Sequence, residues 1–298
     1  MLQERPEAFS HPVVLPKITF YPQERYQCGP AALATVLQAS GVDTTPSALV
    51  PLVYVPERKG SFQVELVAAA RSLGRLAYKI PPTLTALYKE INAGTPVLVM
   101  QNLGLGWYPK WHFAVVKGYD LGRRALIMNS GTHEDYAHSM RTFERTWARA
   151  DHWAIVILTP GQIPASAEPG QYFIAVAALE RSGDPAAIRN AWISGLNKWP
   201  TDRKLMMGYA NHLYQQGDSI AASNQFEQII DTHPEYAPAY NNLGQLLYEQ
   251  GHEKGVSSTS RRRLNGAATL LTITVQPCRR CSGPARIRNR RFAWASRS

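Results

Sequence analysis

The sequence predicts an α+β domain over residues 18–159, followed by an all-α repeat segment at 171–254 and a basic tail at 255–298. In the first segment, helical patterns come first and apolar strand-like runs follow, joined by short turns. This order favours α+β over alternating βαβ units. In the second segment, helical patterns run throughout and recur at a fixed spacing. After Gly251, the periodicity stops and only one acidic residue follows.

Four helices and four strands are expected in the α+β domain. A helix over 30–39 ends at Gly41, a second over 62–73 is capped by Ser61, and a third covers 83–93. Apolar runs at 96–100, 113–119, 125–129 and 153–158 predict strands, and residues 142–148 predict a short helix between the last two.

The segments that flank this domain are irregular in composition. Residues 1–17 are polar and contain proline, so we expect an extended N-terminal arm. Residues 160–170 (PGQIPASAEPG) carry three prolines and two glycines, which predicts a linker.

A repeat with the tetratricopeptide period of 34 residues organises the all-α segment. Each glycine turns one helix into the next, each proline ends the second helix, and a small residue lets the two helices approach closely. The positions that recur at this spacing are Gly183, Gly217 and Gly251; Pro200 and Pro234; Leu179, Leu213 and Leu247; Ile188 and Ala222; and Trp192 and Phe226.

The net charge of +10 belongs to the tail, because residues 252–298 hold 11 of the 32 basic residues and one of the 22 acids. The remaining 21 basic and 21 acidic residues cancel, so no nucleic-acid partner is expected for the folded body. We interpret the tail as the replacement of a repeat helix, for example by a frameshift, and the alternative is a basic tail for RNA or anionic lipid. A metal site is not expected from the single C-x-x-C of Cys278 and Cys281.

Cys28 is the first candidate for chemistry, because it stands just before a helix that opens with Pro30. Unpaired backbone N–H groups and the helix dipole at this position favour the thiolate and predict a lowered pKa. An upstream glutamine, Gln23 or alternatively Gln27, supplies an N–H that would complete an oxyanion hole. The competing interpretation is an inert buried cysteine.

His112 opens an apolar strand after a glycine-containing loop, where its imidazole would act as general base and acid. His152, which heads another strand, is the best alternative base, since His133 and His138 lie in a polar stretch. Asn129 ends the next strand and would accept the other imidazole N–H, with Asp120 and Ser130 as alternatives. These sites could equally be a structural histidine and a turn asparagine.

Together, Q-x(4)-C-G-P-A-A-L (23–33), H-F-A-V-V-K-G-Y-D (112–120) and a strand that ends in a polar residue resemble the peptidase C39 and C39-like group of the papain-like clan. The resemblance covers roughly residues 15–160. It implies a papain-like fold with Cys28 as nucleophile, His112 as base, Asn129 as orienting residue and Gln23 as oxyanion donor. Many C39 domains have aspartate in place of this asparagine.

The resemblance implies a cysteine peptidase that needs no cofactor and acts on a peptide or protein, with the repeats recruiting substrate or a protein partner on their concave surface. The alternatives are a papain-like acyl transferase or amidase, and a non-catalytic C39-like binding module in a repeat scaffold. Because the chain has no G-x(4)-G-K-[ST] motif, the double-glycine substrate of exporter-linked relatives is not carried over. We expect no signal peptide or transmembrane helix in the sequence, although similar proteins suggest bacterial export.

Overall fold

The computed structural model of the protein describes residues 9, 11–23, 27–181 and 183–250. The basic tail expected at 255–298, including Cys278 and Cys281, lies outside these residues. Positions 1–8 of the expected N-terminal arm lie outside them as well. Within the described residues, no helix has the length and apolar character that crossing a bilayer requires.

An antiparallel sheet is the centre of the α+β domain. Its strand order is β2-β7-β3-β4-β5-β6, and β1 pairs with β4 beside this path. Residues of the expected N-terminal arm therefore contribute a strand. The strands are β1 (Val13–Val14), β2 (Leu76–Lys79), β3 (Val97–Asn102), β4 (Trp111–Asp120), β5 (Ala125–Ser130), β6 (His133–Ser139) and β7 (Ala154–Leu158).

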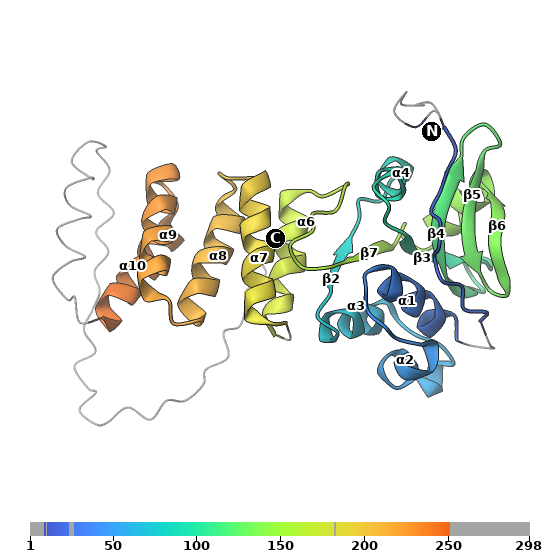
Figure 1. Ribbon diagram of the computed structural model, residues 1–298, viewed down its shortest axis with the longest axis horizontal. Coiled ribbons are helices and arrows are strands. Elements are labelled where there is room, and N and C mark those ends of the chain that lie inside the picture. The colour runs from blue at the N-terminus through green and yellow to red at the C-terminus, as the bar shows by residue number, and fades with distance from the viewer. Residues whose placement is uncertain (1–8, 10, 24–26, 182, 251–298) are drawn as a thin grey trace. The chain divides into compact units, whose positions relative to one another are not determined.

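Helices cover both faces of this sheet. On one face, α1 (Cys28–Ala39), α2 (Pro46–Val53) and α3 (Gln63–Ser72) form a core cluster with alternate residues of β3 and β4, and these three helices lie together beside the sheet (Figure 1). On the other face, α4 (Leu84–Asn92) and α5 (Met140–Ala148) belong to a second cluster. Phe113 and Val115 enter the first cluster and Ala114 and Val116 the second, as the two-residue period of a strand requires.

Besides β1, one α-helix and two strands of this domain were not predicted from the sequence. Helix α2 contains an internal proline, Pro51, which argues against a helix on propensity alone. Strand β2 has only four residues. Strand β6 is mostly exposed, so its polar sequence shows no alternation. Helix α3 was predicted, but its N-cap is Phe62, and Ser61 makes no capping bond.

The C-terminal helices start at regular intervals. Helices α6, α8 and α10 begin at residues 169, 203 and 237, and α7 and α9 begin at 185 and 219, so each step is 34 residues. Trp192 and Phe226, the predicted aromatic positions, are both buried. The bounds are α6 (Pro169–Ala177), α7 (Pro185–Lys198), α8 (Arg203–Gln215), α9 (Ser219–Thr232) and α10 (Ala237–Glu249).

The buried carboxylate of Glu90 binds the expected linker to the α+β domain through hydrogen bonds. Glu90 of α4 accepts hydrogen bonds from the Ala165 N–H (3.2 Å), the Ser166 N–H (2.8 Å) and the Ser166 hydroxyl (2.6 Å). Next to it, the Glu168 N–H donates to the Tyr78 hydroxyl at 3.0 Å. These contacts give residues 165–168 a defined path from the sheet to α6.

We predict that Gly208→Ala destabilises the protein. Alanine normally stabilises a helix interior by about 1 kcal/mol relative to glycine, but here the new Cβ would overlap the ring of Trp192. Overpacking of this kind costs roughly 1–3 kcal/mol, so the free energy of unfolding measured with urea should fall. Gly170→Ala in α6 is the matched control, because its Cβ meets open space. Equal stability of the two variants would contradict this account of the α7–α8 contact.

Candidate functional site

Cys28 is the first residue of α1, two positions earlier than the predicted helix start. Its side chain is half-buried and packs against the core cluster beneath α1. Pro30 has no N–H, so Cys28 and Gly29 are the donors at this end of the helix, and both backbone N–H groups face the sulfur.

The sulfur also faces the backbone N–H of Phe113 in β4. These three N–H groups favour the thiolate, but burial is the larger effect, and it raises the pKa of Cys28 above its ordinary value. The lowered pKa expected from the sequence is therefore wrong for this structure. The helix start does supply donors, but it supplies them to a sulfur that is largely removed from water.

His112 directly precedes Phe113, whose N–H faces the sulfur, but side-chain direction alternates along β4, so the imidazole leaves the strand on the face opposite Phe113. The ring is half-buried, and burial lowers the pKa of His112. Its Nε2 lies 2.9 Å from the Ser130 hydroxyl oxygen. The structure thus pairs His112 with Ser130, one of the two alternatives to Asn129.

Asn129 does not take the expected position beside His112. In the register of β4 and β5 it lies opposite Val115, on the face that packs against α1. Side-chain direction alternates along a strand, so the next residue, Ser130, lies on the opposite face, as His112 does. A difference of one residue along β5 therefore decides which side chain meets the imidazole.

Asn129 instead contacts the backbone of β6. Its Oδ1 accepts the Asp135 N–H at 3.2 Å, where Asp135 has a left-handed backbone (φ 52°). The Asp135 carboxylate forms an ion pair with the buried Lys117 at 2.7 Å. The remaining alternative, Asp120, accepts the Arg123 N–H at the far end of β4.

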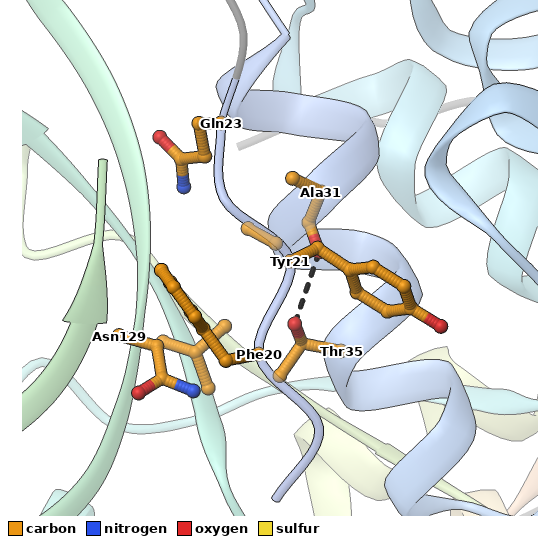
Figure 2. Close-up of a pocket in the computed structure, with 8 residues that line it drawn as sticks. Phe20, Tyr21, Gln23, Ala31, Thr35 and Asn129 are labelled. Atoms are coloured by element: carbon orange, nitrogen blue, oxygen red, sulfur yellow. Dashed lines mark hydrogen bonds between the residues drawn. The ribbon is translucent and has the colours of Figure 1, made fainter. Parts of the chain in front are cut away.

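Gln23 lies next to the strand residue that faces the thiol. Its Nε2 donates to the Phe113 carbonyl at 3.3 Å, and its backbone N–H donates to the Gly131 carbonyl at 3.0 Å. Figure 2 shows Gln23 and Asn129 lining a small hollow across from Ala31 and Thr35 of α1. The alternative donor, Gln27, is the N-cap residue of α1.

The other histidines considered from the sequence have different surroundings. His152 contacts Glu144 (Nε2–Oε1, 3.0 Å) and packs edge-on against Trp147, 4.8 Å between ring centroids. His133 and His138 belong to β6. Within the described part of the chain, no three His, Cys, Asp or Glu side chains gather as a metal-ligand set.

Comparison with known proteins identifies the α+β domain. Residues 16–155 match the model of the Peptidase_C39 like family and form a peptidase C39-like domain, which confirms this part of the prediction. The match ends before the helical segment, so its tetratricopeptide assignment stays a prediction. No curated protein matches this chain.

Three solved structures are similar to about half of the chain. A putative C39-like peptidase from Bacillus anthracis is 19% identical, with 50% of this chain and 98% of that chain covered and a TM-score of 0.43. The peptidase domain of Streptococcus ComA, a bi-functional ABC transporter, is 22% identical (47% and 98% covered, TM-score 0.38). A double glycine motif protease from an AMS/PCAT transporter, solved with a leader peptide, is 22% identical (49% and 96% covered, TM-score 0.37).

We predict that Cys28 reacts with iodoacetamide only as the pH becomes alkaline. Since burial raises its pKa, the thiolate fraction is small at neutral pH and grows as the pH passes the ordinary thiol value of about 8.5. Alkylation of the Cys28 peptide, followed by mass spectrometry from about pH 5 to pH 10 with N-acetylcysteine as reference thiol, measures this. A rate plateau that is already reached below pH 7 would show a lowered pKa and contradict the prediction.

Proposed function

We propose that this protein is a cysteine peptidase that hydrolyses a peptide or protein substrate, with Cys28 as nucleophile and His112 as general base and acid. The observation that carries the proposal is the position of the Cys28 sulfur, at the start of α1 and facing the N–H of the residue next to His112. The C39-like domain at 16–155 supports a peptidase-type function.

In this proposal, Ser130 orients the imidazole. Its hydroxyl engages Nε2, which leaves Nδ1 to exchange a proton with the thiol. A triad of Cys28, His112 and Asn129 was expected from the sequence, but the contacts of Asn129 with Asp135 favour a structural role for it. A hydroxyl carries no charge and does not stabilise an imidazolium as a carboxylate does.

The chemistry therefore starts from a neutral pair. Because burial raises the pKa of Cys28 and lowers that of His112, thiol and imidazole are both uncharged near pH 7. As the sulfur attacks the substrate carbonyl, the proton moves to His112, and it is then given to the leaving amine as the C–N bond breaks. Water next attacks the thioester, loses a proton to His112, and releases the acid and the thiol.

Backbone N–H groups at the start of α1 would hold the negative oxygen of the tetrahedral intermediate. The Cys28 N–H is such a group, because no earlier turn of the helix accepts it. The Gln23 side-chain amide is the second donor we propose. It would exchange its present acceptor, the Phe113 carbonyl, for the substrate oxygen.

The helical segment is proposed to be a tetratricopeptide array that recruits the substrate or a protein partner. The 34-residue spacing of its helix starts supports this assignment. Stacked helix pairs of this kind present a concave surface that suits an extended chain.

A non-catalytic C39-like binding module is the second candidate, and the raised pKa of Cys28 and the uncharged partner of His112 are the observations that favour it. A papain-like acyl transferase or amidase would use the same residues. Product analysis with an added amine acceptor separates transfer from hydrolysis, since only a transferase joins the acceptor to the acyl group.

We predict that Cys28→Ala abolishes cleavage of a synthetic peptide library while leaving the thermal midpoint nearly unchanged, because the thiol is half-buried and small. His112→Ala should lower cleavage by about 100-fold or more, the usual contribution of a general base. Cleavage is measured by mass spectrometry and folding by circular dichroism. Full activity of a folded Cys28→Ala variant would remove Cys28 from the mechanism, and absence of cleavage by the wild type would favour the binding module.

We predict opposite outcomes for two neighbouring residues of β5. Ser130→Asp should raise the pKa of His112 and stabilise the thiolate, so iodoacetamide should modify Cys28 faster near pH 6 than in the wild type. Asn129→Asp removes the amide but keeps an acceptor for the Asp135 N–H, and it should leave the reaction at this pH nearly unchanged. If Asn129→Asp accelerates alkylation and Ser130→Asp does not, Asn129 is the orienting residue.

A further inference from the structure

Exposed aromatic and aliphatic side chains gather in the hairpin that connects β3 to β4. Trp107 is 82% exposed and Tyr108 63% exposed, and Leu103, Leu105 and Trp111 are exposed as well. We call residues 103–111 the aromatic hairpin. Proteins rarely place contiguous large apolar side chains in water unless the surface binds something.

The aromatic hairpin is rigidly built. At its base, the buried Asn102 side chain accepts hydrogen bonds from the Gly104 N–H and the Lys110 N–H, both at 2.9 Å. Near its tip, Leu105 and Tyr108 exchange two backbone hydrogen bonds of 3.1 and 3.2 Å. Gly104 has no room for a Cβ against the Tyr108 carbonyl. The exposed rings therefore stand on an ordered scaffold.

A further contact joins the aromatic hairpin to α5, which covers the face of the sheet opposite α1. Arg149, at the end of α5, donates to the Asn102 carbonyl from Nε at 3.2 Å and from Nη2 at 2.9 Å. A backbone that is already ordered loses little conformational entropy on binding, and Trp and Tyr side chains dominate recognition surfaces.

The aromatic hairpin leads directly into the candidate site. Trp111 is the first residue of β4 and precedes His112. Trp111 and Phe113 point to the same face of the strand, roughly 7 Å apart, and the Phe113 N–H faces the Cys28 sulfur. Trp111 therefore lies on the side of the strand that carries the thiol.

A second exposed apolar group lies at the start of α3. Phe62 is exposed, and so is Val64 two residues further on. Ser61, just before them, lies so close to Gly29 that a Cβ on the glycine would overlap it. Since Gly29 follows Cys28, these side chains also belong to the surroundings of the thiol.

We propose that the aromatic hairpin is the substrate-selecting surface of this site, and that it binds a bulky apolar side chain close to the cleaved bond. This inference rests on the proposed peptidase function. The hairpin and its flanks, residues 101–112, contain no acidic residue and one lysine, so the surface suits an uncharged segment. Insertion into a membrane is less favoured, because exposed apolar residues lie at the base of the hairpin and on α3 as well as at its tip.

The test uses the full chain and tripeptidyl acyloxymethyl ketones, which alkylate an active-site thiol. Each probe carries one leucine in an otherwise Gly–Ser peptide, and the all-Gly–Ser probe is the reference. We expect at least one leucine probe to modify wild-type Cys28 about tenfold faster than the reference. Trp107→Ser combined with Tyr108→Ser should reduce that advantage to about twofold or less. Iodoacetamide should react equally with both proteins, because it is too small to contact the hairpin.

Ile220→Ser is the matched control, because Ile220 is an exposed apolar residue of α9 and should keep the full leucine preference. If iodoacetamide modifies Cys28 but no leucine probe is faster than the reference, the inference is overturned and the peptidase proposal stands. If neither iodoacetamide nor any probe modifies Cys28, both are overturned. Loss of vesicle binding in the Trp107 and Tyr108 double variant, with an unchanged probe preference, would assign the hairpin to a membrane surface instead.

Discussion

The packing of α1 against β4 is the contact on which the candidate site depends. The helix brings Cys28 to the sheet, and the strand brings the Phe113 N–H to the sulfur with His112 one residue away. Buried residues of both elements form one core cluster, so the two cannot shift independently. The position of the thiol beside β4 is thus a property of the core and not of flexible loops.

Burial gives this pair its electrostatic character. It raises the pKa of the thiol and lowers that of the imidazole, so each group favours its neutral form. Ser130 adds no charge to oppose this, whereas a carboxylate at the same place would favour an ion pair. The protein therefore suits a mechanism in which His112 takes the proton during attack, and not one in which a thiolate waits for substrate.

Part of this architecture could be predicted from the sequence, because helix stops such as Gly41 and apolar runs such as 113–119 are local signals. The positions of Cys28 and His112 at the starts of α1 and β4 follow from the same signals. The choice between Asn129 and Ser130 depends on strand register, which a single residue reverses. The pKa of Cys28 depends on how deeply neighbouring elements bury it, which no local signal gives. The order of the aromatic hairpin depends on hydrogen bonds from Asn102, and its sequence alone is that of an ordinary glycine-containing loop.

The central claim is that the His112 imidazole reaches Cys28 when a substrate binds, with Nδ1 toward the sulfur and Ser130 at Nε2. A crystal structure of the protein with a peptide aldehyde added to Cys28 would test it most directly. The account predicts a covalent hemithioacetal, Nδ1 within hydrogen-bond reach of the adduct (roughly 2.6–3.2 Å), and the Nε2–Ser130 contact preserved. An imidazole that turns away from the adduct, or one held by Asn129 instead, would contradict it.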